Sequence, residues 1–279
     1  MPETFIAACV QMRSGRDPAA NRDAAVAGVR EAASRGARLI QTPEMTSLVE
    51  RGRTRLFEAI TAEEADPTLA GLREAAREAG AFIQIGSLAI RVGDKVANRA
   101  YLIDPQGEIA ASYDKVHLFD VDLPSGESWR ESSTYAGGAC AVAAETPLGV
   151  LGLSICYDIR FPALYRALAE AGAEVLTAPA CFTKQTGEAH WHVLQRARAI
   201  ETGSFMISAA QGGLHEDGRE TFGHSVIVDP WGRILAEGGT EPGVILAEID
   251  LSLVADARTR IPALRNARPF TVERVAARS

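Results

Sequence analysis

The sequence predicts an α/β fold in which two mixed sheets pack face to face and helices cover both outer faces, a four-layer α-β-β-α sandwich. Strand-like apolar segments alternate with amphipathic helical ones along the chain. The segments LIDPQGEIAA (102–111) and IVDPWGRILA (227–236) share one pattern, an Asp-Pro-x-Gly turn between two strands, which predicts two similar halves. Because no Gly/Ser/Pro-rich linker separates them, we expect one domain, 1–279, with 258–279 as a C-terminal extension over a neighbour.

The first half is expected to begin with a strand-helix-strand unit and to continue with an antiparallel hairpin. Asp17 and Pro18 supply an N-cap and a first-turn proline for the first helix, which Gly36 ends. The turn Gly93-Asp94 is typical of a hairpin. The expected strands are 5–10, 37–41, 82–90, 96–103 and 108–116; the expected helices are 17–35, a short one within 50–66, and 67–79.

In the second half, the segment 117–138 has no clear periodicity and is expected to be a packed functional loop. A helix should follow Cys156 and end at Gly172, and another should span 188–202. The expected strands are 139–145, 149–155, 174–179, 204–211, 224–229, 234–237 and 244–249.

Composition excludes several classes of protein. The 279 residues are 47% hydrophobic and 23% charged, which is typical of a globular chain with a large core. A net charge of -7 argues against general nucleic-acid binding. The sequence contains no run of 18 apolar residues, so we expect no membrane-spanning helix. The N-terminus does not resemble a signal peptide, and the four cysteines form no CxxC pair. We therefore expect a cytoplasmic protein in a reducing compartment.

Cys156 lies where the apolar strand 149–155 turns sharply into a helix. A side chain at such a junction is held rigidly, and the positive end of the helix dipole favours a thiolate. The alternative is that Cys156 is a small buried apolar residue, because buried cysteine is common. The strand-helix junction leaves the two interpretations about equally weighted.

Two further residues are expected at the carboxyl ends of strands, where side chains from different strands converge. Glu44 follows strand 37–41, and Lys115 ends strand 108–116. Lys115 is one of only three lysines among 29 basic residues. The alternative without a function is that Glu44 is an exposed loop carboxylate and Lys115 a surface cation. Attack on an amide needs a thiolate, a base and a positive charge on the developing oxyanion, and Cys156, Glu44 and Lys115 supply these three.

None of the five histidines has a spacing that identifies it as the base, so a Cys-His pair is not predicted. His190 and His192 lie two apart on a helix and face different sides, which makes them a poor metal site. We expect neither a metal nor a cofactor.

Three ordered segments resemble the nitrilase superfamily of carbon-nitrogen hydrolases: PEM (43–45), YDKVHLFD (113–120) and CYDIRFP (156–162). The resemblance extends from Phe5 to Pro269. It implies the α-β-β-α sandwich, a Glu-Lys-Cys triad and association through dimers, so we expect a homodimer or a larger homo-oligomer.

The resemblance also implies a role for each matching residue. Glu44 resembles the general base, Lys115 the residue that stabilises the oxyanion, and Cys156 the nucleophile. Glu127, in SGESWRES, resembles the second glutamate of the family, which positions the lysine and the substrate. The backbone N–H of Tyr157 would be the other oxyanion donor.

Within the superfamily, HLFDVDLP, ESWRES, FTKQTGEAHWHVLQRARAIE and GHSVIVDPWG are similar to the deaminated glutathione amidase branch. That branch hydrolyses the α-keto form of glutathione to 2-oxoglutarate and cysteinylglycine. The ω-amidase branch, which acts on 2-oxoglutaramate, shares part of the pattern. The chain could also be a different amidase of the superfamily, a non-catalytic scaffold, which the intact triad disfavours, or a thiol-redox protein, which the absence of CxxC disfavours.

A small carboxylated amide entering a negatively charged protein needs a local cation. Arg160, four residues after Cys156, has a planar fork that can hold a carboxylate through two hydrogen bonds. An equally weighted interpretation is that Arg160 pairs with Asp158 and shapes the turn. Thr183 and Phe182, in the loop after the next strand, are further candidate substrate contacts.

Overall fold

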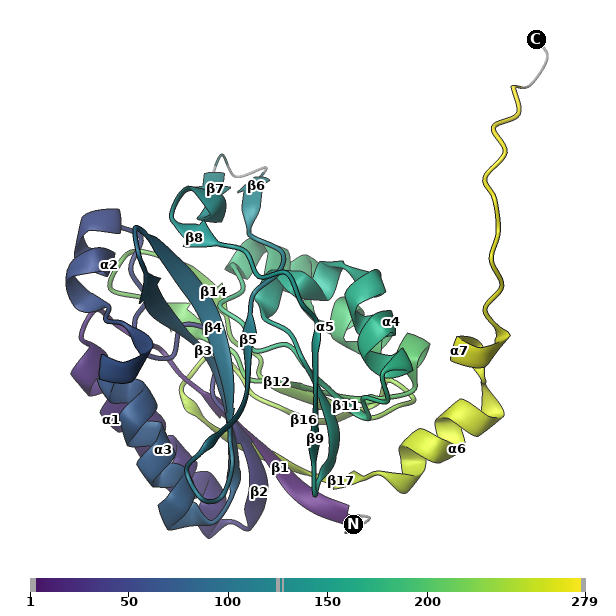
Figure 1. Cartoon of the computed structure of the whole chain (residues 1–279), viewed down its shortest axis with the longest axis horizontal. Coiled ribbons are helices and arrows are strands. Elements are labelled where there is room, and N and C mark those ends of the chain that lie inside the picture. Colours follow the sequence, from purple (N-terminus) through teal and green to yellow (C-terminus); the bar gives the residue numbers. More distant parts are fainter. Residues whose placement is uncertain (1–3, 124–125, 127, 277–279) are drawn as a thin grey trace.

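The computed structural model describes residues 4–123, 126 and 128–276, and it has four layers in the order helices, sheet, sheet, helices. Figure 1 shows helices α1 (Pro18–Ser34) and α3 (Pro67–Ala79) on one outer face and α4 (Pro162–Glu170) and α5 (Lys184–Thr202) on the other. In the described residues, no helix is both long and apolar enough to cross a membrane. The four-layer sandwich expected from the sequence is confirmed.

The first sheet has seven strands, six of which follow the order β17-β1-β2-β3-β4-β5, while the seventh, β8, pairs with β4. Strands β1, β2 and β3 are parallel, and the other pairs on that path are antiparallel. The bounds of the strands are β1 (Thr4–Gln11), β2 (Ala37–Gln41), β3 (Phe82–Val92), β4 (Lys95–Ile103), β5 (Ile109–Asp114), β8 (Tyr135–Ala136) and β17 (Gly243–Asp250).

The second sheet has six strands in the order β16-β15-β12-β11-β10-β9, with a parallel centre formed by β10, β11 and β12. Their bounds are β9 (Val142–Thr146), β10 (Gly149–Leu153), β11 (Val175–Thr177), β12 (Phe205–Ser208), β15 (Val226–Val228) and β16 (Ile234–Glu237). Along both strand orders the central strands are therefore parallel and the outer pairs antiparallel, as expected for two similar halves, while the additional strand β8 runs parallel to β4.

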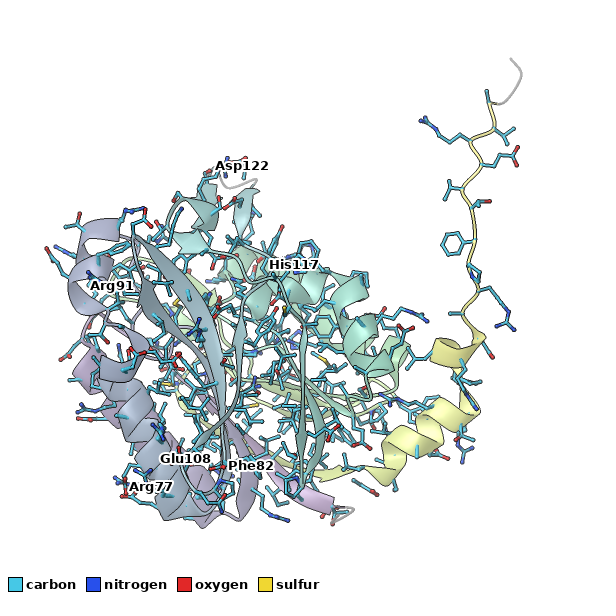
Figure 2. The ribbon with its side chains drawn as sticks, viewed as in Figure 1. Arg77, Phe82, Arg91, Glu108, His117 and Asp122 are labelled. Atoms are coloured by element: carbon cyan, nitrogen blue, oxygen red, sulfur yellow. The ribbon has the colours of Figure 1, made fainter. Side chains whose placement is uncertain are left out.

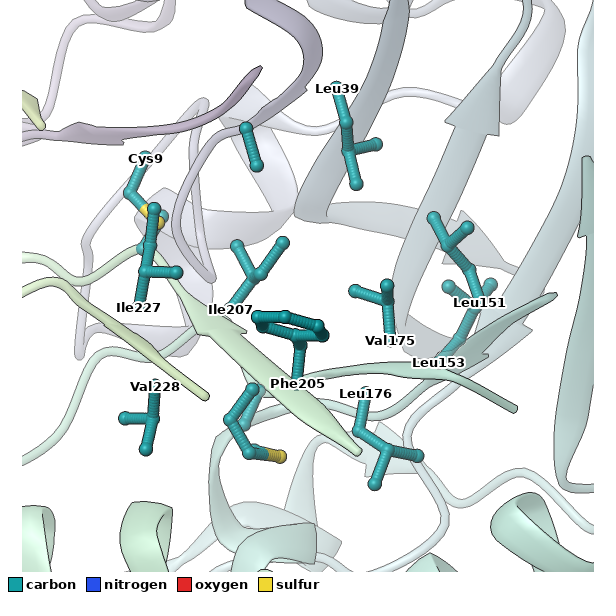
Figure 3. Packing of buried hydrophobic residues seen from close by; sticks show 14 of the residues in the cluster. Cys9, Leu39, Leu151, Leu153, Val175, Leu176, Phe205, Ile207, Ile227 and Val228 are labelled. Atoms are coloured by element: carbon teal, nitrogen blue, oxygen red, sulfur yellow. The ribbon is translucent and has the colours of Figure 1, made fainter. Parts of the chain in front are cut away.

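The largest hydrophobic core lies between the sheets and contains residues of both. Figure 3 shows part of it, with Leu39 of the first sheet near Leu151, Val175 and Phe205 of the second. All four side chains are almost completely buried. Because neither sheet covers its inner face without the other, we propose that the chain folds as one domain.

The helices end where the sequence indicates. The carboxylate of Asp17 accepts hydrogen bonds from the backbone N–H groups at the start of α1, and Asp66 does the same for α3. Gly80 and Gly203 end α3 and α5 in the left-handed conformation that glycine adopts without strain. Helix α5 begins at Lys184, four residues earlier than the sequence pattern predicts.

The repeated Asp-Pro-x-Gly turns have the same geometry in both halves. Asp104 and Asp229 each accept a hydrogen bond from the N–H of the turn glycine, and their carboxylates cap two further N–H groups. The expectation of a separate sheet for each half is wrong at one strand, because β17 pairs with β1 along its whole length. The last strand thus ties the end of the chain to its beginning.

Short elements complete the chain. The short helix expected within 50–66 is α2 (Arg53–Ala59). The elements that the sequence pattern does not specify are η1 (Glu63–Ala65), β6 (Asp120–Asp122), β7 (Ser128–Arg130), η2 (Glu131–Ser133), η3 (Cys156–Arg160), β13 (Gly212–Leu214) and β14 (Glu220–Phe222). After α6 (Ser252–Arg260) and α7 (Ala263–Asn266), the segment 267–276 extends away from the four layers (Figure 1).

Candidate functional site

The three residues singled out from the sequence come together at one edge of the sandwich. Glu44 follows β2, Lys115 directly follows β5, and Cys156 follows β10 after two residues. In Figure 2, Glu108, just before β5, lies low in the view and His117, two residues after Lys115, lies higher, so β5 runs upward in this view toward the lysine. The convergence expected at the carboxyl ends of the strands is confirmed.

Cys156 sits in a sharp turn with a backbone conformation that L-residues rarely adopt, because its φ is +48°. Its N–H donates to the carbonyl of Pro179 at 2.9 Å. The buried carboxylate of Asp158 closes the turn, since it accepts from the N–H of Ile155 at 2.9 Å and from the Tyr113 hydroxyl at 2.7 Å. Strain held in this way by surrounding hydrogen bonds is typical of functional positions.

The thiol of Cys156 is neutral in this environment, contrary to the expectation of a thiolate favoured by a helix. Burial and the negative charge of Glu44 raise the pKa of Cys156 well above its ordinary value, although Lys115 lowers it. The residue begins the single turn η3, and α4 starts only at Pro162, so no long helix dipole acts on the sulfur. The proton of the thiol must therefore be removed by a base.

Glu44 lies beside the thiol and is the candidate for such a base. It is only 4% exposed, and its carboxylate is hydrogen-bonded to the thiol of Cys156. Oε1 accepts from Lys115 Nζ and Asn98 Nδ2, both at 2.9 Å, and Oε2 accepts from the N–H of Cys181 at 2.8 Å. Burial alone would raise the pKa of Glu44, but the ammonium of Lys115 and these hydrogen bonds outweigh it and hold that pKa below its ordinary value.

Lys115 lies between two carboxylates and is 2% exposed. Its Nζ is 2.9 Å from Oε1 of Glu44 and 2.9 Å from Oε2 of Glu131. Burial would lower the pKa of Lys115, but Glu131 and Glu44 raise it well above the ordinary value. The lysine is therefore a permanent cation beside the thiol.

Glu131 is a site residue that the sequence analysis did not identify. Its Oε2 also accepts from the N–H of Phe119 at 2.6 Å, and its Oε1 accepts from Asn98 at 3.1 Å. Glu127, to which the sequence assigned the lysine-positioning role, lies outside the described residues. The two glutamates are four apart in a loop without periodicity, so no local pattern distinguishes them.

These side chains open into a cavity of about 370 Å³. The expected substrate contacts Phe182 and Thr183 line it, together with Tyr157 and the catalytic candidates Glu44, Lys115 and Cys156. Such a volume accommodates a small organic substrate.

Arg160 does not pair with Asp158, so the ion pair expected in the alternative interpretation of this arginine is wrong. The Asp158 carboxylate is taken by Tyr113, Ile155 and His117. The Arg160 guanidinium is not part of the cavity lining, but it lies 5.1 Å from the ring centroid of Phe182 and 5.9 Å from that of Tyr157, two aromatic residues that do line the cavity.

Four arginines that the sequence pattern does not single out line the cavity: Arg51, Arg53, Arg130 and Arg219. Trp129 lies among them, and the guanidinium carbons of Arg51 and Arg219 are each 4.5 Å from its ring centroid. The cavity is therefore rich in cations although the chain has a net charge of -7.

One His/Glu group lies outside the cavity. His192 Nε2 and His224 Nδ1 are 2.8 Å and 2.7 Å from the same oxygen of Glu237, and the three ligand atoms lie within 4.8 Å of one another. The spacing of His190 and His192 gives no sign of this group, because its members come from α5, β16 and the residues before β15.

Comparisons with known sequences agree with this geometry. The carbon-nitrogen hydrolase family matches residues 6–259. The deaminated glutathione amidase of Mus musculus is 41% identical over 86% of this chain and 76% of its own length. The enzyme of the same name from Synechocystis sp. is 40% identical over 94% of this chain and 97% of its own length.

Solved structures are similar as well. The NitFhit protein of C. elegans has a TM-score of 0.89 at 34% identity, over 95% of this chain and 65% of that longer protein. A glutamate-to-glutamine mutant of the amidase from Nesterenkonia sp. AN1, whose active-site cysteine carries the acetamide moiety of fluoroacetamide, has a TM-score of 0.80 at 27% identity, over 95% of this chain and 94% of that one. The chain is thus a member of the carbon-nitrogen hydrolase family, within the nitrilase superfamily.

Proposed function

We propose that the protein is an amidase that hydrolyses deaminated glutathione to 2-oxoglutarate and cysteinylglycine through a thioester on Cys156. The observation that carries the proposal is the buried array of Glu44, Lys115 and Glu131 beside a neutral thiol in one cavity. The relatives named deaminated glutathione amidase support the substrate, since they match most of the chain.

In the first half-reaction, ionised Glu44 takes the proton of the Cys156 thiol as the sulfur attacks the amide carbonyl carbon. The oxyanion that forms accepts hydrogen bonds from Lys115 Nζ and from the backbone N–H of Tyr157. Glu44 then gives its proton to the amide nitrogen, the C–N bond breaks, and cysteinylglycine leaves. The acyl group remains as a thioester on sulfur.

In the second half-reaction, a water molecule replaces the amine. Glu44 takes one proton from this water as its oxygen attacks the thioester carbon, and the same two donors hold the second oxyanion. The C–S bond breaks, 2-oxoglutarate leaves, and the proton on Glu44 returns to sulfur. The enzyme is then ready for another cycle.

Glu131 is the positioning residue for the lysine in this scheme. Its carboxylate is a second anionic partner of the ammonium beside Glu44, and the N–H of Phe119 fixes the orientation of that carboxylate. The pairing of one cation with two carboxylates keeps Lys115 charged throughout the cycle. A similar role for Glu127 stays a prediction.

Arg160 is proposed to hold the 2-oxo acid carboxylate on the acyl side of the substrate. Its guanidinium lies over Phe182 and Tyr157, next to the turn that carries the nucleophile. His190 Nδ1, at 3.2 Å, is its hydrogen-bond neighbour. No carboxylate of the described residues forms an ion pair with Arg160 within 4.0 Å, so its charge faces no competing protein acid there.

The test of the proposed function is an assay of the purified protein with deaminated glutathione and 2-oxoglutaramate, measuring 2-oxoglutarate in both cases. We expect deaminated glutathione to have the higher kcat/KM. A higher kcat/KM for 2-oxoglutaramate would show that the protein is an ω-amidase instead. If the protein turned over neither substrate, both activities would be contradicted, and another amidase activity or a non-catalytic scaffold would be favoured.

Glu44→Gln is expected to slow both the formation of the acyl-enzyme and its hydrolysis, by about 100-fold or more, because the same base serves both steps. Rapid-quench mass spectrometry separates the two rates. Formation of the thioester at the wild-type rate, followed by a stall, would show that Glu44 serves only the water step.

The pH dependence follows from the ionisation of the resting site. Because the pKa of Glu44 is lowered and that of Cys156 is raised, the active form has a carboxylate and a neutral thiol over the neutral range. We expect kcat/KM to be level from about pH 6 to 8 and to fall only where Glu44 protonates, below the ordinary glutamate pKa of about 4.3. A rise through pH 8–9 would instead indicate thiolate formation.

We also propose that the chain forms a cytoplasmic homo-oligomer. Val193 and Ile200 on α5 and the nearby Trp231 are exposed, and so are Phe270 and Val272 of the C-terminal segment. Large exposed apolar side chains of this kind mark surfaces that pack against another chain. The segment 267–276 projects away from the four layers (Figure 1), and we propose that it lies across a second copy.

A further inference from the structure

We propose that Arg219, held over Trp129, forms an anion subsite on the leaving-group side of the catalytic cavity and receives the terminal carboxylate of the cysteinylglycine part of the substrate. This inference rests on the proposed function and extends it, because it assigns the second carboxylate of deaminated glutathione. Arg219 lies between β13 and β14, the hairpin that the sequence pattern did not predict.

Arg219 has hydrogen-bonding capacity that the protein does not use. Its side chain is 15% exposed and lines the cavity. Nη1 donates only to the sulfur of Cys181, a weak acceptor, at 3.4 Å. Nε is 3.7 Å from Oδ2 of Asp217, too far for a hydrogen bond, and it is buried with no hydrogen-bond partner in the described part of the chain. A buried guanidinium with unused donors is costly unless a ligand accepts from it.

Trp129 lies against this guanidinium. The central carbon of Arg219 lies 4.5 Å from the centroid of the indole ring, within the range of a cation–π contact. The ring is itself packed against Phe119, with centroids 6.2 Å apart. The edges of a guanidinium carry the donors that bind a carboxylate in pairs, and Nε of Arg219 has no hydrogen-bond partner among the described residues. The arrangement therefore suits a planar carboxylate better than a neutral group.

The position relative to Glu44 identifies the end of the substrate that Arg219 meets. Cys181 connects the two residues, because its N–H donates to Glu44 Oε2 at 2.8 Å and its sulfur accepts from Arg219. Glu44 gives its proton to the departing nitrogen, so the amine part lies on the Glu44 side. Cysteinylglycine is two residues long and spans about 7 Å when extended. Arg160, near the nucleophile's turn, is left for the acyl carboxylate.

Two more arginines of the cavity are already occupied. Arg130 makes two hydrogen bonds to the carboxylate of Asp122, at 2.8 Å and 2.9 Å. Arg53 donates to the backbone carbonyls of Ser133 and Asp94. Arg130→Met therefore removes the same charge from the cavity wall as Arg219→Met without removing a free donor, and it serves as the matched control.

The experiment compares deaminated glutathione with its C-terminal carboxamide analogue, which differs only in the glycine carboxylate. We expect the wild type to cleave deaminated glutathione with a kcat/KM about 100-fold higher than that of the carboxamide, mainly through a lower KM. The carboxamide cannot form the charged contact with Arg219, and loss of such a contact costs about this factor. Arg219→Met should lose about that factor on the acid and much less on the amide, so the preference disappears. Arg219→Lys should restore part of it, and Arg130→Met should keep it.

Two results would overturn the subsite alone: a wild type that cleaves acid and carboxamide equally well, or an Arg219→Met enzyme that loses the same factor on both. The second result would mean that Arg219 acts only through Cys181 and Glu44. The comparison of the two substrates with the wild-type enzyme needs no variant, so it tests the anion subsite even if Arg219→Met is unstable. A wild type that cleaves neither compound, although it is folded, would overturn the proposed function and the subsite with it.

Discussion

Cys156→Ala is expected to lower kcat on deaminated glutathione by about 10⁴-fold or more, because the thioester cannot form without the sulfur. Alanine keeps the Cβ, so it meets the same backbone strain at φ +48° as the cysteine does. The hydrogen bonds of the turn come from the backbone and from Asp158, and they do not involve the sulfur. The melting temperature should therefore change little, and the loss should be one of chemistry.

The exposed Cys140 provides the matched control, since Cys140→Ala also removes one thiol. Steady-state assays and thermal melts of both variants separate loss of the nucleophile from loss of the fold. A Cys156→Ala preparation, free of wild type, that retains more than about a hundredth of the activity would contradict the assignment of the nucleophile.

Lys115→Arg should have the second largest effect, a loss of about 10³-fold in kcat/KM, although the charge is kept. The ammonium fits within 2.9 Å of both Glu44 and Glu131 in a site that is 2% exposed. A guanidinium is larger and planar, so it displaces at least one carboxylate and moves the oxyanion donor. Since this position is fully packed, the arginine also overfills it, and we expect a lower melting temperature.

Lys184→Arg is the corresponding control, because Lys184 is exposed and pairs with Glu220 at the surface. Its activity and melting temperature should match those of the wild type. If Lys115→Arg were as active as Lys184→Arg, the buried lysine would serve only as a cation and would not be a positioned oxyanion donor.

Local sequence patterns predict the elements at the site because each catalytic candidate lies at or just after the end of a strand that the local sequence indicates. The strand ahead of Cys156, the break after 37–41 and the end of 108–116 are visible without any tertiary information. The turn residues Asp104 and Asp229 likewise act on their own neighbours in sequence. Interactions of this range are encoded locally, so the strands, the turns and the positions of Glu44, Lys115 and Cys156 could be predicted.

Contacts between distant segments could not be predicted in this way. Glu131 reaches Lys115 only because the loop after β5 folds back so that Phe119 N–H binds its carboxylate. Arg219 reaches the cavity only because the β13–β14 hairpin folds over it. The pairing of β17 with β1 joins the two ends of the chain, and the burial that keeps Cys156 neutral depends on both sheets.

The most direct test of the thioester mechanism is intact-protein mass spectrometry on enzyme quenched with acid during steady-state turnover of deaminated glutathione. The mechanism predicts a species heavier by one 2-oxoglutaryl group, which maps to the peptide containing Cys156, is released by hydroxylamine and does not form in Cys156→Ala. Continued product formation with no adduct on the protein, and with no hydroxamate formed when hydroxylamine is present, would contradict it.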